Sequence, residues 1–361
     1  TFITAANLSG TGAVFPDGTF DLNGSTVAGV DFSESNNLII SYDTILTEYD
    51  EELGRYVGAN IAFSTVIWGG VPDDLRGVNI AGVELTWQDL SNVQFDSSTI
   101  LSSDVLGFSA GASLSAENSS KGANLNLHGN VDLRGVNLFH ANLTGSDLRE
   151  ANLNDGTVLD SNNLTRVNLC GVDLASAQFG DYASSHTYDH TYYNSATIFP
   201  EGFNPNDYPG LVLVEDTFTV EGGQGSAPFF LISNDQGTVD FTTYQLHPGS
   251  TYAFRSWEIS QEHSFMIGEN YGDMNSSMVF RGPLTRENEG SLMFLTIPSG
   301  FDGSLYYFCP LHSNMVQEFN VRRPNHTADL NSTVALEMIW VEPGTFTMGS
   351  PTTEAGRQTN E

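Results

Sequence analysis

The chain has 361 residues, with 12 Lys and Arg against 44 Asp and Glu, and a formal net charge of −32 at pH 7. This negative charge disfavours nucleic acid as a partner, because phosphate binding requires positive charge. No run of about 18 or more apolar residues occurs, so no membrane span is predicted. The length suffices for two or three domains.

Residues 1–200 are predicted to form one repetitive domain, because apolar residues recur there every five positions. The periodic positions are Leu22, Val27 and Phe32, then Leu75, Ile80, Leu85, Leu90, Phe95 and Ile100, then Leu133, Leu138, Leu143, Leu148, Leu153 and Val158, and, after a one-residue slip, Leu164, Leu169, Leu174 and Phe179. This period matches neither a helix nor a flat strand. It fits a chain that turns a corner every five residues. Asn or Asp often precedes the periodic residue and suits such a corner.

The stretch Ala141 to Leu153, Ala-Asn-Leu-Thr-Gly-Ser-Asp-Leu-Arg-Glu-Ala-Asn-Leu, resembles the pentapeptide-repeat family. The resemblance implies a right-handed, quadrilateral β-helix. Residues 38–60 break the period and are expected to form a protruding insert, and Cys170 is expected to face outward. A rigid, acidic spacer is the favoured role. Mimicry of DNA, suggested for some relatives, is less favoured, because this solenoid is fused to another domain.

The join to the next domain shows no convincing metal site. His186 and His190 are four residues apart, a spacing that brings two imidazoles together only on a helix. The stretch is rich in Thr and Tyr, so we expect a surface loop. Residues 201–210 contain Pro205 and Pro209 and are predicted to be a linker.

Residues 211–323 are predicted to form a Greek-key β-sandwich, because short alternating runs replace the five-residue period. The expected strands are Leu211 to Val220, Thr238 to Leu246, Thr251 to Trp257, Ser264 to Ile267, Ser291 to Ile297, Leu305 to Phe308 and Val316 to Val321. With the solenoid, this makes the whole chain mainly β.

The strongest chemical signal lies at the end of the run Leu305 to Phe308. Cys309 follows this run, and a short turn then presents His312 and Met315. A thiolate, an imidazole and a thioether on one loop suit a copper ion of the blue, electron-transfer type. Such a site needs a second imidazole, and His263 opens another expected strand.

Through His263 and Cys309-Pro-Leu-His-Ser-Asn-Met315, the domain resembles the cupredoxins. The resemblance implies copper held by His263, Cys309 and His312 in a plane, with Met315 as a weak axial ligand, and a redox protein as partner. The two residues between His312 and Met315 are similar to an amicyanin-type loop, so we expect one copper ion. A metal-free structural relic and another metal are the alternatives.

The C-terminal segment carries a second resemblance. Residues 324–333 are predicted to be a linker. The stretch that follows contains Leu336-Glu-Met-Ile-Trp-Val-Glu-Pro-Gly-Thr-Phe-Thr-Met-Gly-Ser350. Through this stretch, residues 334–361 resemble the opening of a formylglycine-generating enzyme (sulfatase-modifying factor) domain. The resemblance implies a truncated domain whose remainder would be the downstream partner. This chain holds no complete catalytic site, so enzymatic activity is left open.

The predicted function is a copper-binding, electron-transfer module on a pentapeptide-repeat scaffold. The alternative is a non-catalytic structural or interaction scaffold without metal. A single lysine, Lys121, and the expected copper together favour an extracellular or periplasmic location.

Overall fold

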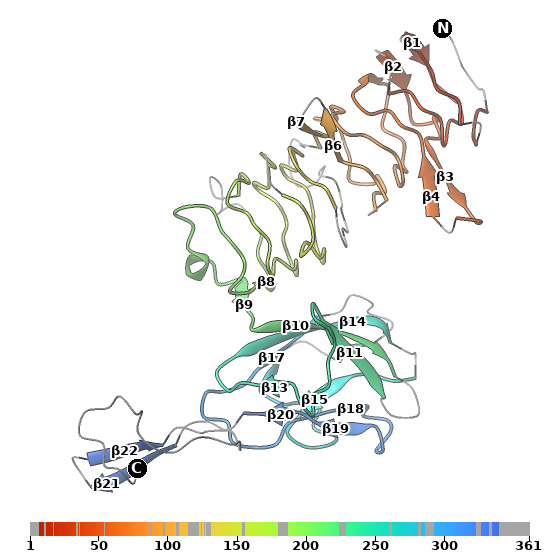
Figure 1. Cartoon of the computed structure of the whole chain (residues 1–361). Helices are drawn as coiled ribbons and strands as arrows, with labels where there is room; N and C mark the ends of the chain where they lie inside the picture. The colour runs from red at the N-terminus through yellow and green to blue at the C-terminus, as the bar shows by residue number, and fades with distance from the viewer. Residues whose placement is uncertain are drawn as a thin grey trace, which may run out of the picture.

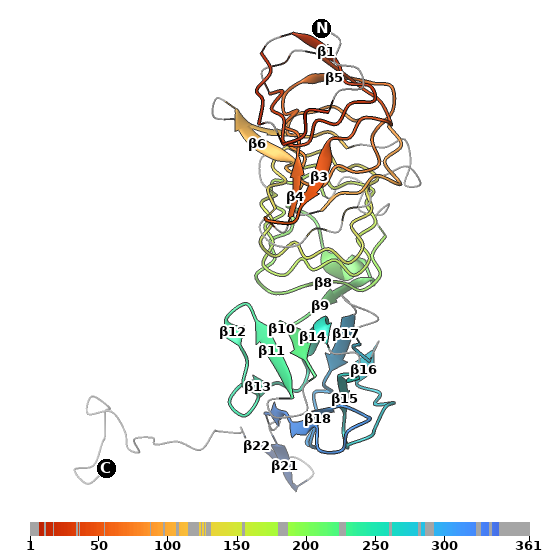
Figure 2. The same ribbon diagram turned by 90° about the vertical axis from the view of Figure 1, so that its right-hand side faces the viewer.

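The computed structural model describes residues 7–338 except 11, 17, 34, 36, 54, 87, 97, 106–107, 115–122, 124, 126, 128–130, 154–155, 180–186, 224–228, 260–261, 281–282, 286–291, 323–325 and 332–333. The described chain is mainly β, and its only helix is the single 3-10 turn η2 (Pro205–Asp207). No helix among these residues is long and apolar enough to cross a bilayer. A coiled N-terminal part and a sheet-rich part follow one another along the long axis (Figures 1 and 2).

The N-terminal part is a solenoid of parallel coils. The strands β1 (Thr19–Asp21), β2 (Asn37–Ile40) and β5 (Thr65–Trp68) pair in parallel between coils. Further along, single parallel bridges replace strands; Asn142 pairs with Asn163, about four repeats later. The predicted corner turns are confirmed, because Asn142 Oδ1 accepts a hydrogen bond from the Thr144 N–H at 3.2 Å. The five-residue period therefore arises from a chain that turns once per repeat.

The solenoid core consists mainly of the predicted periodic residues, but its register differs at two positions. Val158 and Ile100 were expected to point inward. Ile100 is 46% exposed and Val158 is partly exposed, whereas Leu101 and Leu159 are buried. One extra residue in each of these repeats moves the inward position forward. Thr157 then fills the neighbouring buried position, and its hydroxyl donates to the Leu133 carbonyl of an adjacent coil at 2.6 Å.

Only part of the expected insert 38–60 leaves the solenoid. Strand β2 lies within it, with Leu38 and Ile40 fully buried. The hairpin of β3 (Thr47–Asp50) and β4 (Arg55–Gly58) stands off the coil (Figure 1). A second hairpin consists of β6 (Ser102–Val105) and β7 (Phe108–Gly111).

The last coil of the solenoid is closed by aromatic side chains. The Phe203 ring lies 5.2 Å from that of Phe179 and 4.9 Å from that of Tyr208. Strand β8 (Thr191–Tyr193) then pairs in parallel with β9 (Leu211–Leu213). Residues 201–210, expected to be a linker, thus pack on the solenoid end, and β9 adds to its last coil.

Residues 216–321 form two packed layers, one of a six-stranded sheet and the other of a three-stranded and a two-stranded sheet. The first has the order β12-β11-β10-β14-β17-β16. Its strands are β10 (Asp216–Gly222), β11 (Phe230–Asn234), β12 (Gly237–Thr238), β14 (Thr251–Ile259), β16 (Val279–Phe280) and β17 (Leu292–Thr296). Opposite lie β15 (Met266–Gly268), β18 (Tyr306–Phe308) and β19 (Val316–Glu318), and the pair β13 (Gln245–Leu246) and β20 (Asn320–Val321). Phe254 of the first layer packs on Phe265 and Phe319 of the second. The alternating runs had not indicated β11 and β16.

Beyond this part, β21 (His326–Asn331) and β22 (Val334–Met338) form an antiparallel hairpin. Residues 339–361, which carry most of the resemblance to the formylglycine-generating enzyme domain, lie outside the described residues.

A small apolar cluster joins the solenoid to the first sheet. Cys170 and Tyr192 of the solenoid are buried against Ala253 and Phe294 of the sheet. Cys170 was expected to face outward, and it does point away from the solenoid core, yet it is only 3% exposed. Its side chain lies outside the solenoid core but is covered by the sheet, which sequence periodicity alone cannot indicate. Burial also raises the pKa of the Cys170 thiol.

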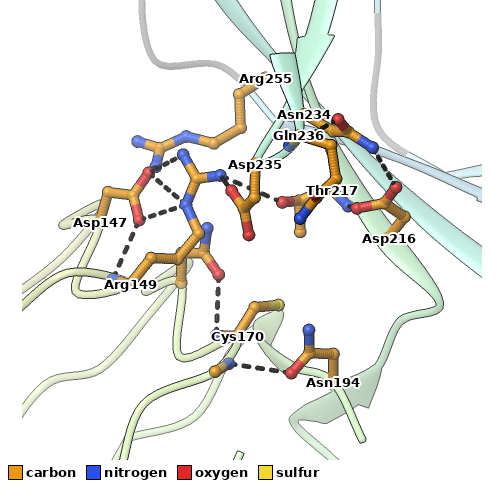
Figure 3. Close-up of polar contacts among 12 residues, drawn as sticks. Asp147, Arg149, Cys170, Asn194, Asp216, Thr217, Asn234, Asp235, Gln236 and Arg255 are labelled. Carbon is orange, nitrogen blue, oxygen red and sulfur yellow. Dashed lines mark hydrogen bonds and ion pairs between the residues drawn. The ribbon is translucent and has the colours of Figure 1, made fainter. Parts of the chain in front are cut away.

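Charged groups next to this cluster pair across the same junction (Figure 3). Asp147 Oδ2 of the solenoid lies 2.8 Å from the Arg149 guanidinium and 3.1 Å from that of Arg255 in β14. Arg149 also pairs with Asp235, and Arg255 donates to the Gly145 carbonyl at 2.9 Å. Burial alone would raise the pKa of Asp147, but the hydrogen bonds from Arg149 and the charge of Arg255 outweigh it, so the pKa lies below its usual range. The carboxylate therefore stays charged between two arginines.

The shifted register predicts different costs for two neighbouring substitutions. Leu159→Ala should lower the free energy of unfolding by about 3 kcal/mol, because it opens a cavity in the solenoid core. Val158→Ala should cost less than about 1 kcal/mol, because this side chain is partly exposed. Urea unfolding of both variants checks the register; a larger cost at Val158 would contradict it.

The junction predicts that Asp147→Asn is strongly destabilising. Asn keeps the corner turn but leaves Arg149 and Arg255 without their shared negative charge, at a cost of about 3 kcal/mol. The stability that the charged Asp147 carboxylate contributes should be fully present at neutral pH. It should fade as the pH falls through the folded-state pKa of Asp147, because that pKa lies below the pKa in the unfolded chain.

The matched control is Asp132→Asn. Asp132 makes the same turn and the same pair with Arg134, at 2.7 Å, in a more exposed setting. Its substitution should cost less than about 1 kcal/mol. Equal losses for the two variants in urea unfolding would show that the junction adds nothing to stability.

Candidate metal centre

The pairing of three short strands brings the candidate ligands together. Met266 of β15 pairs with Phe308 of β18, and Phe308 pairs with Val316 of β19. His263 lies just before β15, and Cys309 directly follows β18. Antiparallel pairing places the start of one strand beside the end of its neighbour. Residues far apart in the chain therefore meet at one edge of this sheet.

The loop between β18 and β19 is closed by its own backbone. The Cys309 N–H donates to the Met315 carbonyl at 3.0 Å, the His312 N–H to the Cys309 carbonyl at 3.2 Å, and the Met315 N–H to the His312 carbonyl at 2.9 Å. These bonds fold 309–315 into consecutive turns. The positions of the side chains are thus set by a hydrogen-bonded loop.

Three ligand atoms converge at this edge. The Nδ1 atoms of His263 and His312 are 3.1 Å apart, and the Sγ atom of Cys309 lies 3.8 Å from the first and 3.5 Å from the second. Metal–nitrogen bonds of about 2.0 Å and metal–sulfur bonds of about 2.3 Å place such donors about 3.3–3.7 Å apart. The observed separations of 3.1–3.8 Å are close to this range, so the three atoms are placed as a group that could hold one ion. In the described part of the chain, they form the one group of three or more His, Cys, Asp or Glu side chains close enough to share an ion.

The same contacts also have a metal-free interpretation. A neutral imidazole has one donor and one acceptor nitrogen, and a thiol is a weak donor. The three groups can therefore hydrogen-bond to one another without an ion.

The centre lies between core and surface. Cys309 and Met315 are 0% and 1% exposed and belong to the core between the two packed layers. Both histidines are partly buried, and Leu311 beside them is 73% exposed. The sulfur is therefore shielded from solvent, whereas the His312 imidazole is partly accessible. The structure brings His263, Cys309 and His312 together, and Met315 lies on the same loop; its role as axial ligand stays a prediction.

Two neighbours of the centre were missed by sequence reasoning. The Tyr271 hydroxyl donates to the Pro310 carbonyl at 3.3 Å, and its ring lies 5.3 Å from that of Phe308. Tyr271 thus contacts the residues on both sides of Cys309. Gly223 lies directly behind His263. The pair Gly222-Gly223 could have marked a close approach of backbone, whereas nothing in the sequence signals Tyr271.

Other histidines lie apart from the centre. His190 pairs with Asp189 and stacks on Phe280 with ring centroids 4.5 Å apart. The ring of His247 lies 3.7 Å from Glu215. His186 is outside the described residues, so the expected loop at 186–190 is described only in part.

Comparison with known proteins identifies only part of the solenoid. A family model described as pentapeptide repeats matches residues 128–155, with eight copies. Two solved structures of trypsin-treated QnrB1, a plasmid-mediated fluoroquinolone resistance protein, are 15% and 14% identical, cover 59% of this chain and 90% and 91% of their own, and have TM-scores of 0.19 and 0.20. No curated protein matches the chain. The segment 128–155 of the solenoid thus consists of pentapeptide repeats.

Proposed function

We propose that residues 211–323 are a cupredoxin-like module that binds one copper ion and transfers electrons, carried on the pentapeptide-repeat solenoid. The observation that supports this most is the meeting of His263 Nδ1, Cys309 Sγ and His312 Nδ1 within 3.1–3.8 Å of one another. These three residues would hold the ion. The bound copper would supply the redox change, and the chain would supply ligands and a fixed frame.

The donor set favours copper over other metals. Two imidazoles and one thiolate form the trigonal set of blue-copper sites, in which a thioether completes the coordination weakly. Met315 is buried on the same loop and is the available thioether. Divalent copper also binds nitrogen and sulfur donors more strongly than other first-row divalent ions. Zinc in structural sites takes four strong ligands, often with more than one thiolate.

The surroundings of the ligands suit electron transfer. The loop 309–315 is fixed by backbone hydrogen bonds, and the Cys309 side chain is fully buried. Such a frame limits movement when the charge of the ion changes. The exposed Leu311 and the partly buried His312 form the surface that a redox partner protein would approach.

The wider setting of the module is also part of the proposal. The solenoid would act as a rigid spacer, since its last coil packs on the first sheet through Cys170 and Tyr192. We place the protein outside the cell or in the periplasm, where copper is available. A sulfatase-modifying-factor-like domain downstream in the same chain would be a further partner, on the resemblance of residues 334–361.

The alternative function is a structural or interaction scaffold without metal. The observation that favours it is that the Cys309 thiol lies within hydrogen-bond reach of both imidazoles, so that one Nδ1–H can donate to Sγ while the S–H donates to the other Nδ1. In that case the packed sheets only position a neighbouring domain.

The copper proposal predicts binding of one Cu(II) per chain. Titration should give an absorption band in the visible range and an electron-spin resonance signal from a thiolate–copper bond. Cys309→Ser should lose both, because the hydroxyl replaces the only thiolate of the centre. His247→Ala, which removes a histidine outside the centre, should bind as the unaltered protein does.

A protein that stays colourless and binds no Cu(II) would contradict this function and favour the scaffold. Thermal unfolding provides a second measure, since a ligand at 100 times its Kd stabilises the folded state by about 2.7 kcal/mol. That gain should be absent in Cys309→Ser.

A further inference from the structure

Gly223 occupies a strained backbone position directly behind the His263 ligand. It follows strand β10, and its N–H donates to the Phe229 carbonyl at 2.9 Å. Its φ of +83° lies in the left-handed region, where residues with a Cβ atom are disfavoured. A glycine at this position therefore allows a backbone shape that other residues adopt only with strain.

The space around Gly223 leaves no room for a side chain. A Cβ atom built there would lie 2.7 Å from the Cβ of His263 and 3.4 Å from its Cγ and Cδ2. Carbon atoms in contact are about 3.5–4.0 Å apart. The His263 residue is thus confined between this backbone on one side and His312 and Cys309 on the other.

We propose that Gly223 is a positioning residue for the metal centre, because its backbone holds His263 at the distance from Cys309 that an ion requires. This inference rests on the proposed copper site and deepens it. Metal sites depend on groups that orient the ligands, and changing such groups typically lowers metal affinity about 10–100-fold. An added methyl group at position 223 would push the imidazole out of place.

The preceding residue provides a matched control. Gly222 also has a left-handed backbone, with φ of +93°. A Cβ atom there would meet its nearest neighbours, Leu231 N and the Phe229 carbonyl oxygen, at 3.7 Å. Alanine at 222 or 223 therefore brings comparable backbone strain, and only alanine at 223 collides with His263.

The test compares Cu(II) affinity and the visible spectrum of both variants. Gly223→Ala should bind Cu(II) at least about tenfold more weakly and show an altered thiolate–copper band. Gly222→Ala should keep the affinity and spectrum of the unaltered protein, even though its backbone strain lowers the stability of the fold. Equal affinities for the two variants would overturn the proposal.

A second background keeps the test decisive if Gly223→Ala folds poorly. In His263→Gly, added imidazole can supply the missing ligand, and no side chain remains for the new methyl group to strike. Gly223→Ala should then have no further effect on Cu(II) binding, and its loss of stability should match that of Gly222→Ala, because only the backbone strain remains. If it costs as much affinity in this background as in the unaltered protein, Gly223 does not act through His263.

The metal-free crystal structure of Gly223→Ala separates this inference from the copper proposal. The separation of His263 Nδ1 from Cys309 Sγ should exceed the 3.8 Å of the unaltered chain. An unmoved imidazole would overturn the positioning role even if copper binds. Failure of the unaltered protein and of Gly222→Ala to bind Cu(II) would instead overturn the copper site, and with it this role.

Discussion

The candidate centre depends on the antiparallel pairing of β18 with both β15 and β19. This pairing carries Cys309 to the edge where His263 enters β15, although 46 residues separate them in the chain. The loop that returns to β19 is closed by hydrogen bonds between Cys309, His312 and Met315. The ligand atoms are thus placed by backbone bonds, which exist before any ion binds. Such pre-organisation lowers the cost of assembling a site.

The same sheets fix the module to the solenoid. Strand β14, which leads toward His263, carries Arg255, and Arg255 contacts Asp147 and the Gly145 carbonyl of the solenoid. The junction combines a small apolar cluster with charges of both signs, and Asp147, Arg149, Asp235 and Arg255 pair with one another across it. The stacked coils and the packed sheets are thus joined directly, and they follow one another along the long axis (Figure 2).

The sequence predicted what depends on short-range patterns. The five-residue period indicated the stacked coils and the Asn and Asp corner turns. The Cys309–Met315 motif with His263 indicated candidate ligands, of which the structure brings His263, Cys309 and His312 together. The sequence was not sufficient where contacts between distant parts of the chain determine which side chains are buried. The sequence allows either Ile100 and Val158 or Leu101 and Leu159 to face the core. The choice depends on contacts between coils, such as the hydrogen bond from the buried Thr157 hydroxyl to an adjacent coil. Cys170 is covered by a sheet more than eighty residues away. Gly223 and Tyr271 lie beside the ligands through tertiary contacts that no local motif records.

X-ray absorption at the copper edge of the loaded protein tests the central claim most directly, because it measures the bonds of the ion. The account predicts one short copper–sulfur bond and two copper–nitrogen bonds of about 2.0 Å, with the sulfur bond lost in Cys309→Ser. A copper ion bound only by oxygen and nitrogen would contradict the assignment of His263, Cys309 and His312 as its ligands.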